Sequence, residues 1–353
     1  MRVRRTRGWW RFVLASACAL ILGAAPMPGP LTVDEFTSYT ALIASPLKRL
    51  RPRLAWKQVV PEVKEVRIPS SADGSRQPAL FHAPADRAES RPLLVVLHSW
   101  SVDYLDRASA PYGLWAVRND WVFIHPEYRG RFDRPEATGS ELAVQDILDA
   151  VEYARAHAKV DPDRIYLVGY SGGAMMALTM AGRNPELWAG VVAWVPVFDL
   201  AQWHEETRRK YPRYARNIRD SCGGEPVAGS EAAEECRRRS PSTYLGGARG
   251  KGVRVLICAG IEDPLVSPAH SLAAFNVLAS REDRFSEEQI RRVAEEGAVP
   301  TEGDGAVEDA RYEQAGRPLL LRRGSGQVTL HLYRGRHDVI YNAGLLWLAG
   351  LKR

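Results

Sequence analysis

Short apolar runs alternate with longer segments of helical character from about residue 62 onward. Several of these runs are apolar at consecutive positions, which is typical of strands buried on both faces of a sheet. Helical segments separate most of them, as in a parallel sheet that is covered by helices. The pattern therefore predicts an α/β fold with a mostly parallel, eight-stranded sheet flanked by helices. The expected strands are residues 63–69, 78–84, 92–98, 121–126, 164–170, 190–197, 253–260 and 327–333.

The clearest helix runs from Glu141 to about Lys159. Ser140 stands immediately before it and can cap the first turn through its side-chain oxygen. The spacing of apolar residues over this segment predicts one long helix between two strands. Its apolar positions include Leu142, Ile147, Leu148, Val151 and Tyr153.

Two stretches interrupt the alternation. Residues 200–250 are rich in Arg, Glu, Trp and Tyr, and we expect them to form a cap-like insertion. Their aromatic side chains could form the core of that cap or could stack on a bound ring. Residues 281–318 are rich in charge and end in an acidic, glycine-containing segment, so we expect a solvated surface excursion.

The N-terminus has the composition of a secretory signal peptide. A basic start precedes the uncharged run FVLASACALILGAA at residues 12–25, and prolines follow it. We expect residues 1–25 to be a signal peptide and the protein to be exported to the periplasm or the extracellular space. An uncleaved membrane anchor is the alternative. Residues 26–60 then form an N-terminal extension that packs on the domain formed by residues 61–353.

Composition and charge exclude several function classes. Hydrophobic residues make up 45% of the 353 positions and charged residues 25%, which are ordinary values for a folded domain and argue against disorder. The formal net charge is +6, but five arginines lie within the first eleven residues, so the remainder carries only +1. Basic charge is therefore a property of the N-terminus, and we expect no nucleic-acid partner.

Cysteine positions indicate an oxidising compartment and no metal site. Cys18 would leave with the signal peptide, whereas Cys222 and Cys236 lie in one polar stretch and could close a short loop as a disulfide. Two unrelated thiols are the alternative. Cys258 lies in an apolar run and is expected in the core. CxxC, HExxH, EF-hand and P-loop motifs are absent from the sequence, and we expect no metal and no cofactor.

One serine has the sequence context of a nucleophile. Ser171 lies in Gly169-Tyr170-Ser171-Gly172-Gly173, between an expected strand and an apolar helix, which is the GxSxG pattern of a nucleophile elbow. The turn is so sharp that side chains two residues on either side of the serine would collide with the neighbouring strand and helix. Glycine at those positions therefore indicates that the Ser171 hydroxyl is exposed above the sheet.

A serine hydroxyl needs a base, and the base needs a carboxylate that orients it. In the nucleophile-elbow arrangement these groups follow in the order Ser, Asp, His, each after a strand. Asp263 follows the strand at 253–260, and His337 follows the strand at 327–333. We expect Asp263 and His337 to complete the catalytic set. Asp199, which follows the strand at 190–197, is the alternative acid.

Two backbone N–H groups are candidates for an oxyanion hole. The N–H of Gly172 begins the helix after Ser171 and points toward a developing negative charge. A second donor is expected from the segment that follows the strand at 92–98. We assign it to Trp100, and Ser99 is the alternative donor. The sequence does not identify substrate-binding residues.

These motifs resemble the α/β-hydrolase superfamily, and within it the prolyl oligopeptidase catalytic domain and its dienelactone-hydrolase and acetyl-xylan-esterase relatives. The resemblance covers roughly residues 60–350. It implies an α/β-hydrolase fold with a Ser171, Asp263, His337 triad. The most specific segments are VDPDRIYLVGYSGG at 160–173, PEYRG at 126–130, AGIEDPLV at 259–266 and GRHD at 335–338.

The sequence thus predicts an exported serine hydrolase that forms an acyl-enzyme at Ser171. A peptidase of the prolyl oligopeptidase type, acting on short peptides, is the first expectation. A carboxylesterase of the acetyl-xylan-esterase or small-ester type is the alternative, and a catalytically silent binding protein with the same fold is the third. The expected partner is a small molecule or a short peptide, with a membrane involved only if the N-terminus stays uncleaved.

Overall fold

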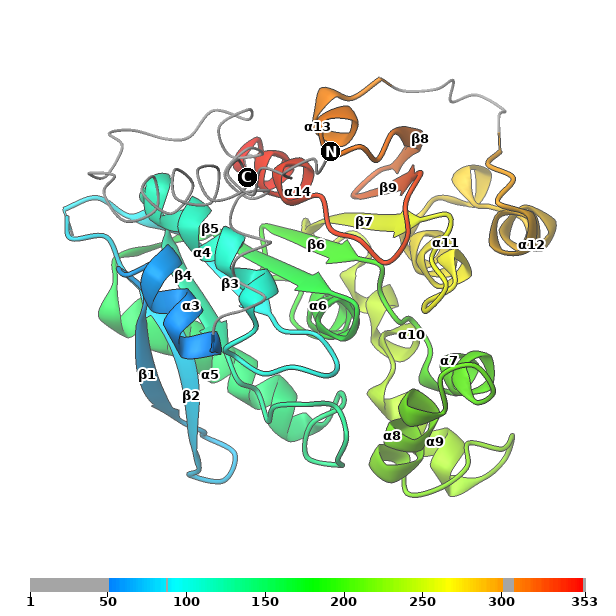
Figure 1. Ribbon diagram of the computed structural model, residues 1–353, viewed down its shortest axis with the longest axis horizontal. Helices are drawn as coiled ribbons and strands as arrows, with labels where there is room; N and C mark the ends of the chain where they lie inside the picture. Colours follow the sequence, from blue (N-terminus) through cyan, green and yellow to red (C-terminus); the bar gives the residue numbers. More distant parts are fainter. Residues whose placement is uncertain (1–50, 87, 301–307, 352–353) are drawn as a thin grey trace, which may run out of the picture.

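A single sheet organises the computed structural model, which describes residues 51–86, 88–300 and 308–351 (Figure 1). The described strands follow the order β1-β2-β4-β3-β5-β6-β7-β9-β8. The six strands from β4 to β9 in this order are parallel, and the antiparallel strands β1, β2 and β8 lie at the two edges. The bounds are β1 Lys64–Pro69, β2 Arg76–His82, β3 Arg91–Leu97, β4 Val122–Pro126, β5 Val160–Tyr170, β6 Gly190–Trp194, β7 Arg254–Gly260, β8 Leu319–Ser325 and β9 Val328–Tyr333.

The α/β class and the mostly parallel sheet are confirmed, but the number of strands is wrong. All eight expected runs form strands, and the described chain adds a ninth, β8. This strand pairs with β9 alone, at the edge of the sheet. Its arginines break the apolar run that a buried strand would show, and both are half-buried against partners from other segments. The Arg322 guanidinium pairs with Asp309, and the Arg323 guanidinium lies over the Phe285 ring, 4.1 Å from its centroid.

Helices cover both faces of the sheet (Figure 1). Because side chains alternate between the faces of a strand, neighbours in β5 belong to different cores. Leu167 packs with α5, α6 and α11, whereas Val168 packs with α3, α4 and α14. The helices are α3 Pro52–Val59, α4 Ala110–Arg118, α5 Glu141–His157, α6 Gly172–Arg183, α7 Leu200–Thr207, α8 Pro212–Cys222, α9 Glu231–Arg239, α10 Pro241–Tyr244, α11 Pro268–Leu278, α12 Glu287–Glu296, α13 Ala310–Gln314 and α14 Tyr341–Ala349, with short 3-10 turns η1 Arg107–Ser109, η2 Leu245–Ala248 and η3 Arg281–Asp283.

The expected long helix is α5. Ser140 caps it, because its hydroxyl oxygen accepts a hydrogen bond from the Ala143 N–H at 3.0 Å. The helix ends at His157, two residues before the expected end, because Val160 already pairs with β3.

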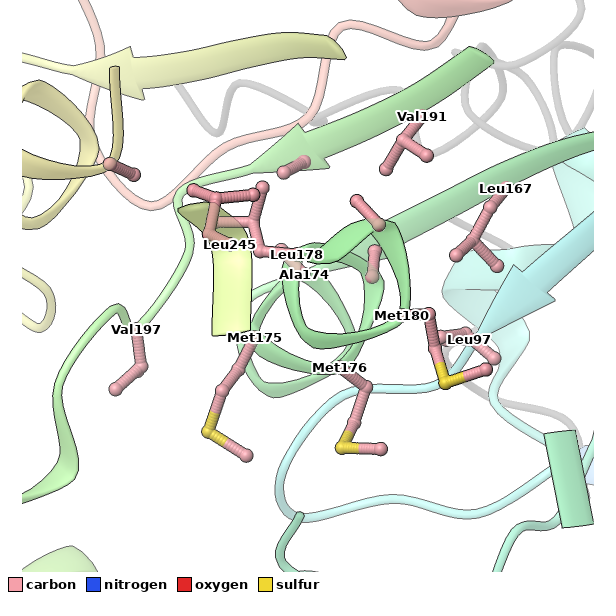
Figure 2. Close-up of a cluster of buried hydrophobic side chains, with 14 of the residues drawn as sticks. Leu97, Leu167, Ala174, Met175, Met176, Leu178, Met180, Val191, Val197 and Leu245 are labelled. Atoms are coloured by element: carbon pink, nitrogen blue, oxygen red, sulfur yellow. The ribbon is translucent and has the colours of Figure 1, made fainter. Parts of the chain in front are cut away.

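Helix α6 is buried along its whole length. Figure 2 shows Met175, Met176 and Met180 extending from it, with Leu97 beside Met180 and with Leu167 on the adjacent strand. Each of the three methionines is 0% exposed. Methionine fills irregular space well, and here Met175 and Met176 extend from the side of α6 away from the sheet, whereas Met180 lies beside Leu97 of β3. The N-terminus of this helix is therefore held firmly against the ends of the strands.

The segment expected as a cap folds into α7 to α10 and η2, which lie beyond the carboxyl end of β6 (Figure 1). The end of α10 lies close to α6, because a Cβ on Gly182 would collide with the carbonyl of Tyr244. Cys222 and Cys236 form a disulfide with 5.4 Å between their Cα atoms, and it joins the end of α8 to α9. A disulfide of this kind indicates an oxidising, exported environment. Cys258 is a buried free thiol, as expected.

The N-terminal segments and the charged stretch lie only partly within the described residues. The expected signal peptide at 1–25 and most of the extension at 26–60 lie outside the described residues. The end of that extension forms α3, which buries Trp56 against α4. The charged stretch at 281–318 contains η3, α12 and α13, with 301–307 outside the described part. Among the described helices, none combines the length and apolar character that a membrane crossing requires.

Replacing both disulfide cysteines, in Cys222→Ser with Cys236→Ser, should lower the free energy of unfolding by about 3 kcal/mol, because the bond closes a short loop in the unfolded chain. Denaturant titration of the oxidised protein and of the double variant measures this difference. Reductant should destabilise the natural protein and leave the double variant unaffected. Equal stability of the two proteins would show that the bond does not constrain the cap.

Candidate active site

The candidate nucleophile lies on a strained turn between β5 and α6. Ser171 has φ 55° and ψ −115°, a conformation that a non-glycine residue adopts only when its surroundings enforce it. The Ser171 N–H donates to the Trp194 carbonyl at 2.8 Å, which ties the turn to the end of β6. A Cβ on Gly169 would collide with the backbone of Gly173, and a Cβ on Gly173 would collide with the Leu97 carbonyl. These close approaches explain the glycines of the motif.

Ser171, His337 and Asp263 form one hydrogen-bonded chain. His337 Nε2 lies 2.9 Å from Ser171 Oγ, and His337 Nδ1 lies 2.6 Å from Asp263 Oδ2. The Asp263 side chain is 1% exposed, but its Oδ1 accepts hydrogen bonds from the Leu265 and Val266 N–H groups. Those donors stabilise the carboxylate as an anion away from water. The geometry suits a serine that loses its proton to an oriented imidazole.

The His337 segment is fixed by contacts from three sides. Tyr170 Oη donates to the His337 carbonyl at 2.9 Å, and the Glu262 N–H donates to the Gly335 carbonyl at 2.9 Å. The Arg317 guanidinium lies 2.7 Å from Asp338. Burial acts to raise the pKa of Asp338, but hydrogen bonds from Arg317 and from the Arg336 N–H outweigh it, and the pKa lies below its ordinary value. Contacts to residues 335–338 therefore hold His337 in place.

The alternative acid is occupied elsewhere. Asp199 caps α7 by accepting from the Gln202 N–H at 2.9 Å, and it also accepts from Ser242 Oγ at 3.0 Å. Neither of these contacts involves His337. Asp199 therefore stabilises the start of the cap, where α7 leaves the sheet.

The candidate oxyanion donors lie side by side. A Cβ built on Gly172 would meet the Trp100 nitrogen at 2.8 Å, and the nearest atoms all belong to Trp100. Within the described part of the chain, neither of the two N–H groups donates to a protein acceptor. The Trp100 indole packs edge-on against Trp203 of the cap, with 4.8 Å between ring centroids, and donates to Asn217 at 3.3 Å. The segment that carries Trp100 is thereby attached to the cap.

A cavity of about 190 Å³ lies beside His337, on the sheet face that α4 and α14 cover. We call it the His337 cavity. Burial raises the pKa of Asp106, one of its lining residues, to about 6, and the negative charge of Asp103 adds to this effect. Asp106 was not expected from the sequence, although its place in the segment after β3 could have indicated a residue near the site. The lining consists of Val96, Leu97, Ser99, Asp106, Ala108, Ser109, Tyr112, Val168, Gly169, Tyr170, His337, Asp338, Val339 and Tyr341.

Within residues 51–86, 88–300 and 308–351, no three or more His, Cys, Asp or Glu side chains cluster in a way that could hold a metal ion.

Comparisons with known proteins find similarity to a peptidase family and to a solved peptidase structure. A family model described as the prolyl oligopeptidase family matches residues 137–295, which include Ser171 and Asp263 and end before His337. Among solved structures, a putative dipeptidyl aminopeptidase IV from Bacteroides ovatus superposes with a TM-score of 0.51 at 16% identity. That superposition covers 81% of this chain and 34% of the other. It supports the fold.

Two curated relatives carry esterase names. The putative esterase NocK of Nocardia uniformis subsp. tsuyamanensis is 32% identical over 196 residues, which is 51% of this chain and 53% of that protein. The versiconal hemiacetal acetate esterase of Dothistroma septosporum is 28% identical over 216 residues, or 58% of this chain and 60% of that protein. The chain thus spans little more than half the length of these relatives. These similarities agree with the expected resemblance to α/β hydrolases over the matched segments, and the superposed structure agrees with the expected fold.

Gly173→Ala should lower the free energy of unfolding by about 1 to 3 kcal/mol, because the added methyl group is forced against backbone that cannot move aside. Gly324→Ala is the matched control, since a Cβ at Gly324 meets no atom within 4 Å. Its effect should stay within about 0.5 kcal/mol. Denaturant unfolding of both variants measures the contrast, and equal shifts would mean that the turn has room for a side chain.

Proposed function

We propose that this serine hydrolase, a member of the α/β-hydrolase superfamily, is an exported peptidase that cleaves short peptides through an acyl-enzyme at Ser171. The observation that carries the proposal is the hydrogen-bonded chain from Ser171 through His337 to Asp263. The match to the prolyl oligopeptidase family supports the peptidase activity.

In the proposed mechanism, His337 Nε2 accepts the proton of Ser171 as Oγ attacks the scissile carbonyl carbon. The carbonyl oxygen becomes an anion, which the Gly172 and Trp100 N–H groups stabilise by hydrogen bonds. His337 then gives the proton to the leaving amine, and the C–N bond breaks. Water repeats the sequence on the acyl-enzyme, with His337 again as the base. The carboxylic acid leaves and Ser171 regains its proton.

Asp263 has an orienting role in this mechanism. By accepting the Nδ1–H of His337, it keeps Nε2 unprotonated and directed at Ser171, and it stabilises the imidazolium that forms during the reaction.

Burial of the site supports a preference for small substrates. Ser171 is 4% exposed, and the His337 side chain is 16% exposed. A short peptide or a small ester can bring its carbonyl to such a serine without the local unfolding that a peptide bond buried in a folded protein would require.

Carboxylesterase activity is the second candidate function. Two of the curated relatives that this chain resembles are named as esterases, and the same triad would cleave an ester. The two candidates differ in the leaving group, since an amide requires a proton from His337 before its nitrogen departs.

Two observations support the proposed export of the protein. The disulfide indicates an oxidising compartment, and the sequence of residues 1–25 has the composition of a cleaved signal. We infer that residues 1–25 direct the chain out of the cytoplasm and are then removed.

Hydrolysis of short-chain p-nitrophenyl esters and of proline- and alanine-type peptide anilides, measured in one panel, tests the activity. Cleavage of both classes is expected, and cleavage of esters alone would favour the carboxylesterase. Ser171→Ala and His337→Ala should each lower kcat by about 10⁴ or more, and the double variant should be little worse than either. If neither class is turned over above the Ser171→Ala background, the chain is a silent fold and the proposal is wrong.

The matched control for the acid compares two aspartates that each follow a strand. Asp263→Asn should lower kcat by about 10⁴, because the amide favours the wrong imidazole tautomer. Asp199→Asn keeps a capping side chain on α7 and should retain activity within threefold. Comparable losses in the two variants would contradict the assignment of Asp263.

The mature N-terminus tests export. Mass spectrometry of the protein from the exported fraction of its native cells should find a chain that begins at or near residue 26. Intact residues 1–25 in the membrane fraction would contradict cleavage and support the uncleaved anchor.

A further inference from the structure

The His337 cavity has the chemistry of an ammonium site. Tyr112, Tyr170 and Tyr341 contribute aromatic walls, and Asp106 contributes a carboxylate. The rings of Tyr112 and Tyr341 meet edge to face, with 5.1 Å between their centroids. Aromatic faces attract cations through their quadrupole, and a carboxylate adds a full charge to that attraction.

The Asp106 carboxylate is only partly satisfied by the protein. Its Oδ1 accepts a hydrogen bond from the Ala108 N–H at 3.0 Å. Its Oδ2 accepts no hydrogen bond from any described residue. The cavity wall therefore offers one carboxylate oxygen to which no described residue donates a hydrogen bond.

The electrostatic field in the cavity is negative. Burial is the main reason that the pKa of Tyr170 is raised, and the carboxylates of Asp263, Asp106 and Asp338 raise it further. The cation on the same side, Arg317, is paired with Asp338. Arg107 acts on Asp106 less strongly than Asp103 does. A positive group in this cavity would therefore find favourable charge.

The position of the cavity identifies the part of the substrate that would occupy it. His337 lines the cavity, whereas no residue of the 200–250 cap does. In acyl transfer the base gives its proton to the leaving atom, so the leaving group lies next to the imidazole. Trp100 and the cap residue Trp203 that packs against it do not line the cavity, so we assign the acyl group to their side of the triad.

We propose that the His337 cavity binds the leaving group and that Asp106, with the three tyrosines, selects leaving groups that carry an ammonium charge. Lysine-type residues on the amine side of a peptide bond and amino-alcohol esters belong to this substrate class. The inference rests on the proposed function, because it assigns a leaving-group side to the same triad.

Two esters of butanoic acid test the selection. The choline ester carries a fixed positive charge on its leaving group, and the 3,3-dimethylbutyl ester has the same shape without the charge. At pH 8, where Asp106 is ionised, kcat/KM should be at least tenfold higher for the choline ester. In Asp106→Asn the ratio of the two kcat/KM values should fall by tenfold or more. Asp103→Asn, the same charge change at an exposed neighbour outside the cavity, should keep the ratio within threefold.

A second measurement needs no variant. Free choline should inhibit hydrolysis of the 3,3-dimethylbutyl ester at a concentration at least tenfold lower than 3,3-dimethylbutanol does. Turnover of both esters at equal kcat/KM, with equal inhibition by both alcohols, would overturn the inference while leaving the proposed function intact. A protein that cleaves peptide anilides but hydrolyses neither ester above the Ser171→Ala background would overturn the inference alone. Failure to cleave the esters and the anilides alike would overturn the proposed function, and this inference with it.

Discussion

The backbone at Ser171 constrains everything around it. A residue held at φ 55° between β5 and α6 is tolerated only because Gly169 and Gly173 let strand and helix approach closely, and because the Trp194 carbonyl anchors the turn. Helix α6 is buried along its length, and its methionines belong to the core that surrounds it. The packing of α6 in the core therefore keeps the Ser171 turn rigid.

The alignment of strand ends brings distant segments to this turn. Gly169 of β5 pairs with Leu97 of β3 and with Ala193 of β6, so the loops that follow these strands begin at the same level. Gly260 of β7 pairs with Tyr333 of β9 in the same way, which puts the loops that carry Asp263 and His337 beside each other. Parallel strands end at one edge of a sheet, so residues from widely separated parts of the chain meet there.

The cap is joined to this edge by polar contacts that sequence reasoning did not predict. His270 Nδ1 accepts from the Phe198 N–H at 3.1 Å, while its Nε2 lies 3.2 Å from Glu206 of α7. His270 is 0% exposed, so these contacts join α7 to α11 inside the protein. On the opposite side, Trp100 packs on Trp203. The cap is thus attached both to α11, the helix that follows the Asp263 loop, and to the segment that carries Trp100, a candidate oxyanion donor.

The sequence by itself determined the class of the fold, eight of the described strands and the positions of Ser171, Asp263 and His337 at strand ends, because apolar runs, glycine spacing and strand order are local properties. It did not determine β8, whose arginines interrupt the apolar pattern and find their partners, Asp309 and Phe285, only in the folded chain. It favoured Asp263 by strand order but left Asp199 as the alternative, since both follow strands and only the folded chain shows which carboxylate faces His337. Only the tertiary structure determined the His337 cavity. Asp106 and three tyrosines from separate elements meet there because of packing that no local sequence pattern predicts.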